Sequence, residues 1–271
     1  MHYKGLNRKP IGIFDSGIGG MTVAKSIFDI LPNENVIYLG DTARLPYGTK
    51  SKETVIVYSI ESLKFLISKK VKLIVVACNT ASSVAVSFLQ KITKIPVIGV
   101  ISPGSKAASV YTKNGKIGVI GTKGTVRSKS YIKNIHKYNP RLEIHSQPCS
   151  LFVQLAEDGW TENRIAELTA VEYLKGIKEK GIDTLILGCT HYPILKKTIG
   201  KVMGKGVKLV DSGEETAKEV KKILEEKNLL NLQKSKGKHK FFVTDFPDNF
   251  KIISERFLGQ KIMEVKKVKL Q

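Results

Sequence analysis

An internal repeat is the feature of this sequence that most constrains its fold. The apolar run that ends at Cys78 resembles the run that ends at Cys189, 111 residues later. Val100 and Asp211 end another pair of apolar runs at the same spacing, and the segment that begins at Ile11 has a counterpart 106 residues further along. Three similar segments in the same order indicate two similar halves, roughly residues 1–100 and 101–211.

Short apolar runs alternate with helix-like segments throughout the chain. The patterns at residues 51–69 and 165–180 are typical of helices. Strands are predicted at residues 11–14, 36–39, 73–77, 97–100, 117–120, 142–145, 184–187 and 207–210. Apolar strands separated by helices indicate parallel sheets that are covered on both faces.

The predicted fold class is therefore α/β, with two similar domains that each contain a mostly parallel sheet flanked by helices. We expect a pseudo-twofold axis to relate the domains and the active site to lie between them. Residues 1–100 plus 212–271 are predicted to form the first domain and residues 101–211 the second. Ser212 and Glu215 fit a capping box that begins a helix extending to about residue 230.

The composition is that of a globular protein. Hydrophobic residues make up 42% of the 271 residues and charged residues 25%, which excludes a disordered chain. No apolar run approaches the ~18 residues of a membrane span, and the first ten residues lack the apolar stretch of a secretory signal. The three cysteines include no C-x-x-C pair, so we expect neither a disulfide framework nor a zinc site. The sequence thus predicts a soluble cytoplasmic protein without a membrane partner.

The charge balance raises the question of a polyanionic partner. Lys and Arg total 45 against 24 Asp and Glu, a net charge of +21. Only six of these basic residues are arginines, the type favoured for base readout and for bidentate phosphate contacts. The lysines are spread over almost every predicted helix. We therefore interpret the charge as a composition bias and do not expect a nucleic-acid partner, and a non-catalytic polyanion-binding protein stays open as an alternative.

Each half places a cysteine directly after a buried strand and before a turn that contains threonine. Backbone N–H groups at the start of the next helix would lower the pKa of such a thiol, and they can also hold a carboxylate. Two thiols on opposite sides of a cleft can invert a carbon centre, because one acts as base and the other as acid. Covalent catalysis is the alternative, but it needs only one thiol. Cys149 has no counterpart in the repeat and is predicted to be structural.

Several other residues allow a structural interpretation beside a functional one. Asp15 follows a buried strand within the repeat, which favours a functional carboxylate, but it could also form an Asx turn and a helix cap. Arg44 could pair with Asp41 as readily as contact a substrate. Four histidines are scattered and are predicted to be surface or incidental residues: His2, His136, His145 and His239.

A set of motifs in this chain resembles the glutamate racemases, a branch of the aspartate/glutamate racemase superfamily. The resemblance runs from about Pro10 to the end, in the family's order and spacing. The motifs are DSGIGG at residues 15–20, GDTARLPYG at 40–48, ACNTA at 77–81, GTKGTV at 121–126, LGCTHYP at 187–193 and VDSG at 210–213. The family usually has a proline at the position of Gln154, which puts the local loop geometry in question.

The resemblance implies a two-base interconversion of L- and D-glutamate whose product feeds peptidoglycan synthesis, with no cofactor and no metal. Cys78 would handle the proton on the D face and Cys189 the proton on the L face, with auxiliary acid/base groups at Asp15 and His191. The implied substrate-binding positions are Asp15, Ser16, Tyr47, Gly48, Asn79, Thr80, Thr122, Glu157, Thr190 and His191. A racemase for aspartate or another acidic amino acid is the alternative within the superfamily, and a homodimer stays open.

Overall fold

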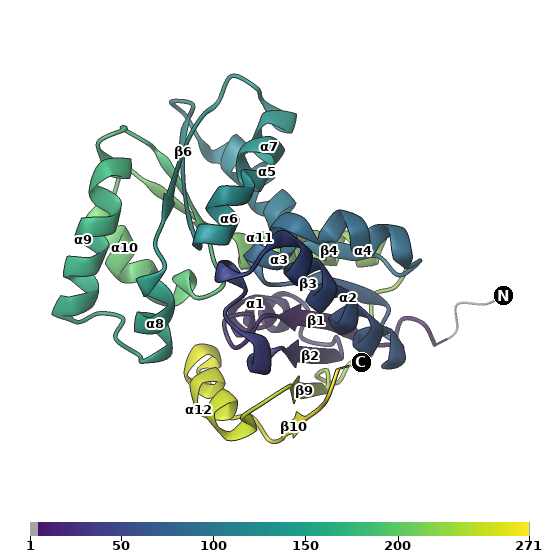
Figure 1. Ribbon diagram of the computed structural model, residues 1–271. Helices are drawn as coiled ribbons and strands as arrows, with labels where there is room; N and C mark the ends of the chain where they lie inside the picture. The colour runs from purple at the N-terminus through teal and green to yellow at the C-terminus, as the bar shows by residue number, and fades with distance from the viewer. Residues whose placement is uncertain (1–4, 271) are drawn as a thin grey trace.

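The computed structural model describes residues 5–270 and contains two separate parallel sheets (Figure 1). The first sheet has the strand order β10-β9-β2-β1-β3-β4 and the second has the order β6-β5-β7-β8. The first contains β1 (Ile11–Asp15), β2 (Val36–Gly40), β3 (Leu73–Val76), β4 (Val97–Gly99), β9 (His239–Val243) and β10 (Val265–Lys267). The second contains β5 (Lys116–Gly121), β6 (Glu143–Pro148), β7 (Thr184–Gly188) and β8 (Lys208–Asp211).

The order β2-β1-β3-β4 of the first sheet recurs as β6-β5-β7-β8 in the second. β1 thereby corresponds to β5, β3 to β7 and β4 to β8, which are the three pairs that the sequence repeat predicts. The prediction of an α/β fold with two parallel sheets is confirmed. β9 and β10 extend only the first sheet, because β9 pairs with β2 and β10 pairs with β9. This pairing supports the domain division at residues 100 and 212, which we retain as a proposal.

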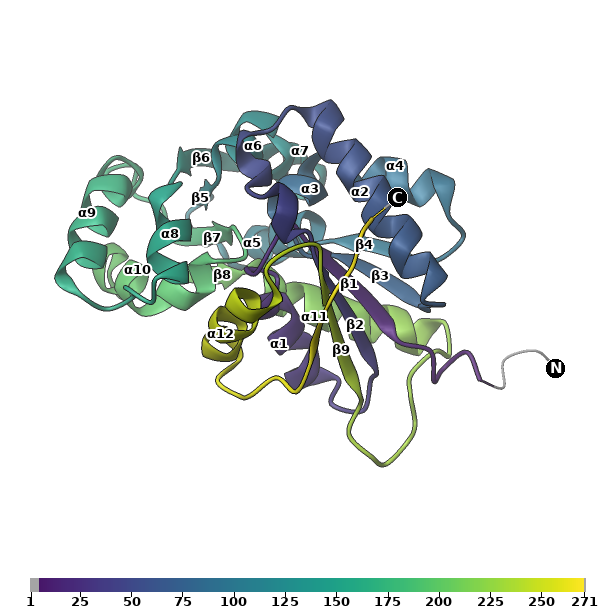
Figure 2. The ribbon, with the colours of Figure 1, turned by 60° about the horizontal axis from the view of Figure 1, so that its bottom comes forward.

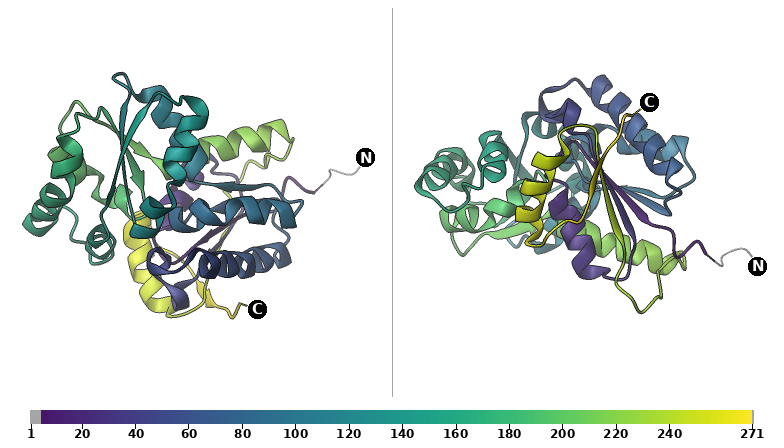
Figure 3. Two further views of the ribbon diagram at one scale, coloured as in Figure 1. Left: turned by 45° about the horizontal axis from the view of Figure 1, so that its top comes forward. Right: turned by 90° about the horizontal axis from the view of Figure 1, so that it is seen from below.

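Helices cover both faces of each sheet (Figure 2). On the first sheet, one face carries α1 (Met21–Ile30), α11 (Ser212–Glu226) and α12 (Pro247–Leu258), and the other carries α2 (Lys52–Ser68), α3 (Asn79–Val84) and α4 (Val86–Ile92). On the second sheet, α5 (Ile101–Tyr111) and α7 (Ser130–Tyr138) lie opposite α8 (Leu151–Glu157), α9 (Arg164–Lys178) and α10 (Lys196–Met203). The short helix α6 (Lys123–Ser128) follows β5. Figure 3 shows α11 leaving the second sheet to pack beside α1.

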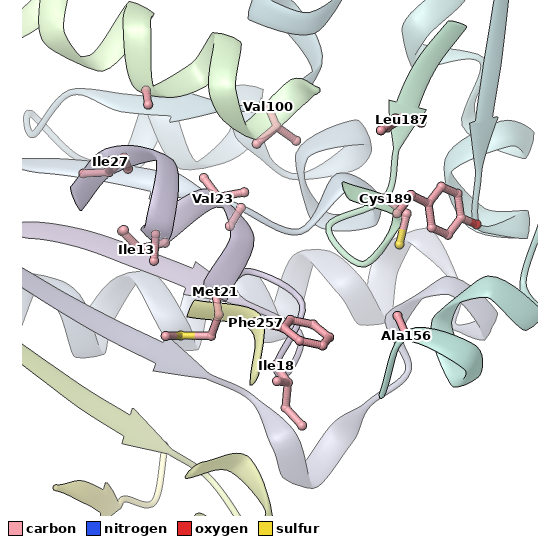
Figure 4. Packing of buried hydrophobic residues seen from close by; sticks show 14 of the residues in the cluster. Ile13, Ile18, Met21, Val23, Ile27, Val100, Ala156, Leu187, Cys189 and Phe257 are labelled. Carbon is pink, nitrogen blue, oxygen red and sulfur yellow. The ribbon is translucent and has the colours of Figure 1, made fainter. Parts of the chain in front are cut away.

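The strands alternate their side chains between two apolar layers, as buried parallel strands must. In β1, Ile13 joins the layer that contains α1, whereas Phe14 joins the layer that contains α2. The first layer does not stop at the sheet but continues through Leu187 and Cys189 into the second half. Figure 4 shows Ile13 and Met21 on one side of this cluster and Leu187 and Cys189 on the other. The two halves therefore share one apolar core.

A buried ion pair anchors the segment that follows α11. Lys72 Nζ lies 2.5 Å from Glu34 Oε2 and also donates to the Leu229 carbonyl at 2.7 Å. The other carboxylate oxygen of Glu34 accepts from the backbone N–H of Asn231 at 2.8 Å. Both charged side chains are 1% exposed, so each depends on the other and on these carbonyl and amide partners. The chain is thus directed back to the first sheet, where it forms β9.

The capping box predicted at Ser212 is wrong by one residue. Asp211 is the N-cap of α11, and its Oδ1 accepts from the backbone N–H of Gly213 at 2.8 Å. The helix ends at Glu226 rather than near residue 230, since Asn228 adopts a left-handed backbone conformation with φ 54°. The side chain of Ser212 is consequently free to bond elsewhere, at the junction of the two halves.

His239 is not the incidental surface residue that the sequence analysis expected. Its ring stacks on Phe28 with the ring centroids 3.7 Å apart, and its Nε2 is buried without a hydrogen-bond partner among residues 5–270. Burial lowers the pKa of His239 to about 4.

The structure also contains no helix, within the residues it describes, that is long and apolar enough to span a membrane.

Because the stacked ring of His239 is buried, we expect the stability of the folded protein to depend on pH. Between pH 6.5 and about 4 the unfolded chain binds a proton at this histidine while the folded chain does not, so stability falls as the pH falls. His239→Phe keeps the stack on Phe28 and removes the titration. We expect urea unfolding to show a smaller loss of stability over this range in the variant than in the wild type. Equal losses in the two proteins would contradict the assignment.

Candidate active site

The carboxyl ends of the central strands of both sheets meet between the two halves. In each sheet the strand order reverses at the central pair, β1–β3 or β5–β7, and ligands of open α/β sheets bind at such a point. β1 ends at Asp15 and β3 leads into Cys78, while β5 leads into Thr122 and β7 into Cys189. The sequence-predicted catalytic residues therefore lie at corresponding ends of the repeated sheets.

Polar contacts join the predicted residues across the two halves. The hydroxyl oxygens of Thr80 and Thr122 lie 2.9 Å apart, and Thr22 Oγ1 donates to the Thr190 carbonyl at 2.7 Å. Gly48 lies so close to Thr122 that an added Cβ would be 2.9 Å from the threonine Cβ. At most 7% of each of the following predicted residues is exposed: Asp15, Cys78, Asn79, Thr80, Cys189, Thr190 and His191. These predicted site residues are thus closed off from solvent.

Cys78 is the N-cap of the short helix α3. Its Sγ accepts from the backbone N–H of Ala81 at 3.4 Å. Burial, together with the charge of the neighbouring Asp15, raises the pKa of the Cys78 thiol to about 12. The backbone N–H of Ala81 lowers this pKa, as expected at a helix N-terminus, and so does the side chain of Ser16, but burial beside the Asp15 carboxylate outweighs both. Cys78 is therefore a thiol at neutral pH.

Asp15 forms the expected Asx turn and also keeps one carboxyl oxygen without a partner among the described residues. Its Oδ2 accepts from the backbone N–H of Gly17 at 2.9 Å, which is the expected Asx turn, although the cap of α1 is Gly20. Its Oδ1 is buried and has no hydrogen-bond partner among the described residues. Burial raises the pKa of Asp15, while His191 and the backbone N–H groups of the turn partly offset this rise. A carboxyl oxygen thus remains available beside Cys78.

Cys189 lies in a different electrostatic setting. His191 Nδ1 is 3.8 Å from its Sγ, and His191 Nε2 is 2.9 Å from Glu157 Oε1. Burial by itself would lower the pKa of His191, but the hydrogen bonds and charges of Cys189 and Glu157 raise it to about 10. Phe257 of α12 packs edge-on against the imidazole, with centroids 5.9 Å apart. A positively charged imidazole is thus held between a sulfur and a carboxylate.

Tyr47 and Arg44 both hydrogen-bond to Asp41. The Tyr47 hydroxyl donates to Asp41 Oδ2, and Arg44 Nε donates to the same oxygen at 2.7 Å. Arg44 also pairs with Glu61. The salt-bridge interpretation of Arg44 is therefore confirmed. Burial and the charge of Asp41 raise the pKa of the Tyr47 hydroxyl, so this group stays protonated.

The remaining predicted residues have clear places in the structure. Ser16 lies beside Cys78, and its side chain lowers the pKa of that thiol. Gln154 lies within the regular helix α8, and Glu157 ends that helix and contacts His191. Cys149 is fully buried and its Sγ is 3.7 Å from the Gln147 carbonyl, consistent with a packing role. Residues 5–270 contain no group of three His, Cys, Asp or Glu side chains suited to a metal.

Sequence reasoning missed several residues that complete the site. Tyr131 of α7 donates to Asn79 Oδ1 at 2.7 Å, and Thr125 Oγ1 lies 3.4 Å from Thr80 Oγ1. Phe257 packs on His191 from the C-terminal helix. Thr125 stands within the GTKGTV motif and could have been included. Tyr131 and Phe257 occupy ordinary positions of amphipathic helices, and no local pattern distinguishes them from core residues.

The two repeated parallel sheets, with a predicted catalytic cysteine after a central strand of each, are those of an amino-acid racemase, and the comparisons show the same class. The chain belongs to the Asp/Glu/Hydantoin racemase family, whose model matches residues 19–220. Within it the chain is similar to the glutamate racemase of Geobacter metallireducens, with 54% identity over 263 residues that cover 97% of each chain. It is also similar to the glutamate racemase of Neisseria meningitidis serogroup A, with 47% identity and 97% of each chain covered.

Solved structures also place the chain among the glutamate racemases. The glutamate racemase of Francisella tularensis in complex with D-glutamate superposes with a TM-score of 0.91 and 44% identity, over 97% of this chain and 98% of that one. The Picrophilus torridus aspartate racemase has a TM-score of 0.58 and 20% identity, over 83% and 100% of the two chains. The second likeness shows the fold alone.

The close approach of the halves at Gly19 yields a test of the closed site. A Cβ at this position would overlap the side chains of Thr190 and His191. We expect Gly19→Ala to lower racemase activity by about 10²-fold, because a shift of about 1 Å in reacting groups has this effect. The matched control is Gly176→Ala in α9, where an added methyl group meets no atom within 4 Å. Full activity in Gly19→Ala, measured by polarimetry, would show that catalysis does not use this closed arrangement.

Proposed function

We propose that this protein interconverts L- and D-glutamate by a cofactor-independent two-base mechanism and thereby supplies D-glutamate for peptidoglycan. One observation carries the proposal. Two cysteines stand at corresponding strand ends of a repeated sheet, face one closed site, and have different acid/base partners, Asp15 for Cys78 and His191 for Cys189. This arrangement supplies a base and an acid for opposite faces of one carbon.

In the L-to-D direction, Cys189 acts as the base. The imidazolium of His191, oriented by Glu157, stabilises negative charge on the Cys189 sulfur. This thiolate takes the α-proton of L-glutamate and becomes a thiol, and the electron pair stays on the substrate carbon. Cys78, held as a thiol by its raised pKa, then donates its proton to the other face and becomes a thiolate.

The D-to-L direction uses the same groups with their roles exchanged. Cys78 must first lose a proton, and Asp15 is the carboxyl group beside it with an unpaired buried oxygen. The raised pKa of Asp15 suits a group that exchanges a proton with this thiol. Because the two enantiomers have equal free energy, kcat/KM must be the same in both directions, so the different partners can change kcat and KM between the two directions only by the same factor.

The two carboxylates of glutamate require hydrogen-bond donors in this site. The backbone N–H groups at the start of α3 and the hydroxyl and amide groups around it supply them. We assign substrate binding to Ser16, Tyr47, Gly48, Asn79, Thr80, Thr122 and Thr190, together with Asp15, Glu157 and His191. A racemase for aspartate would share the proton transfers and differ in the pocket for the side-chain carboxylate. We further propose a cytoplasmic location, where the free thiols stay reduced, and leave a homodimer open.

Replacement of either catalytic cysteine tests the two-base mechanism. Cys78→Ala and Cys189→Ala each remove one proton carrier, so racemisation should fall about 10²–10⁴-fold in both directions. Cys149→Ala is the matched control, since its sulfur bonds only a backbone carbonyl, and its rate should stay within a few-fold. Near-normal racemisation in either of the first two variants would refute the mechanism and require one-base or covalent catalysis.

Isotope entry from heavy water tests which thiol serves which face. Newly formed D-glutamate should carry deuterium at Cα from the first turnover, because the donor is not the group that removed the proton. Cys78→Ala should still exchange the α-proton of L-glutamate through Cys189, and Cys189→Ala that of D-glutamate through Cys78. Proton NMR of both enantiomers measures this exchange. Exchange of the same enantiomer in both variants would contradict the assignment of faces.

Substrate preference separates glutamate from its close analogues. Glutamine lacks the side-chain carboxylate and would leave buried donors poorly paired, at roughly 1–3 kcal/mol each. We expect kcat/KM for glutamine to be at least about 10–100-fold below that for glutamate. Circular dichroism with each L-enantiomer gives the comparison. Comparable turnover of glutamine would contradict the pocket, and faster turnover of aspartate would favour the aspartate racemase.

A further inference from the structure

Tyr131 lies at the junction of three segments that carry the site. It belongs to α7 on the second sheet, and only 2% of it is exposed. Its hydroxyl lies 2.7 Å from Asn79 Oδ1 in the first half and 2.8 Å from Ser212 Oγ at the start of α11. Asn79 directly follows Cys78 in the chain. The buried Tyr131 hydroxyl therefore contacts Asn79, a predicted substrate-binding residue.

The number of hydrogens at this junction determines the direction of each bond. Asn79 Oδ1 can only accept, so the single hydrogen of the Tyr131 hydroxyl is donated to it. With its hydrogen given to Asn79, the Tyr131 oxygen can only accept from Ser212 Oγ at 2.8 Å, so the single Ser212 hydrogen goes to this shorter bond and not to the Leu187 carbonyl, which lies 3.3 Å from Ser212 Oγ. The result is a chain of hydrogen bonds from Ser212 through Tyr131 to Asn79.

This chain leaves the amino group of Asn79 for a ligand. With Oδ1 bound to Tyr131, the amide plane is fixed and Nδ2 points away from that hydroxyl. Within residues 5–270, Asn79 Nδ2 makes no hydrogen bond. Both of its hydrogens therefore remain available at the site. A carboxylate accepts from such a pair of hydrogens, whereas the reversed amide would present an oxygen and repel it.

The ring of Tyr131 also reaches the other catalytic strand. A Cβ added to Gly188 would lie 3.0 Å from Tyr131 Cε2, so the ring passes close to β7 because this residue has no side chain. Gly188 immediately precedes Cys189. The tyrosine is therefore in contact with the residue after Cys78 and with the residue before Cys189, and its position depends on both halves being in place.

We propose that Tyr131 is a positioning residue for racemisation: with Ser212 behind it, its hydroxyl orients the Asn79 amide so that the amino group binds a substrate carboxylate. The inference rests on the proposed function, since it assigns one donor of the glutamate site. It predicts that the Tyr131 hydroxyl acts on substrate binding and only through Asn79. A purely structural hydrogen bond would affect stability and leave substrate binding unchanged.

The test is a double-mutant cycle of Tyr131→Phe and Asn79→Ala. Tyr131→Phe should raise KM for both enantiomers of glutamate by about tenfold or more, with kcat changed much less, because the lost bond serves ground state and transition state alike. In the Asn79→Ala background, Tyr131→Phe should raise KM no further. An equal KM increase in both backgrounds, or an unchanged KM in the single variant, would overturn the proposal.

Two further variants keep the test independent of folding. Tyr173→Phe is the matched control, since its hydroxyl accepts from the Leu151 N–H of α8 at 3.2 Å and makes no hydrogen bond to a predicted site residue, and KM should not change. Ser212→Ala removes the donor to Tyr131 and should raise KM in the same direction even if Tyr131→Phe does not fold. An unchanged KM in folded Ser212→Ala would count against the chain of bonds. If the wild type does not racemise glutamate, the proposed function is refuted. If the wild type is active but KM does not change in the variants, only the role of Tyr131 is refuted.

Discussion

The close approach of the two sheets at the carboxyl ends of their central strands is the constraint on which the rest of the site depends. An acid and a base act on opposite faces of one carbon only if they face each other across a gap of substrate size. A parallel sheet brings the ends of its central strands to one edge, and the repeated strand order supplies the second edge. The loops can meet because Gly19 and Gly48 have no side chains where Thr190, His191 and Thr122 approach them.

The repeated scaffold surrounds its two cysteines with different charged neighbours. Cys78 is buried beside a carboxyl group, whereas Cys189 faces an imidazole that a second carboxylate holds. Part of this difference comes from α12, which has no counterpart in the second half. Its Arg256 donates to the Glu157 carbonyl at 2.8 Å, and its Phe257 packs on His191. The C-terminal extension of the first sheet therefore completes the electrostatic setting of the second cysteine.

The contacts between the halves differ in kind from one side of the site to the other. On the side of α1, the apolar core continues without interruption from Ile13 to Cys189, and separating it would expose apolar surface at roughly 25 cal/mol per Å². On the side of α3, the halves meet through the hydroxyl groups of Thr80 and Thr122, which water can replace. Tyr131 and Ser212 lie between these regions, so the hydrogen bonds that orient Asn79 depend on the closed arrangement.

Local patterns in the sequence determined the parallel α/β architecture and the correspondence of β1 with β5 and of β3 with β7. They also determined that Cys78 and Cys189 occupy equivalent positions in the repeat. They did so because strand burial, helix periodicity and repeated spacing are properties of short segments. Only the tertiary structure decided that burial raises the pKa of Cys78, that Arg44 belongs to Asp41, and that Tyr131 supports Asn79. These depend on desolvation and on contacts between segments far apart in the chain, which no local pattern encodes.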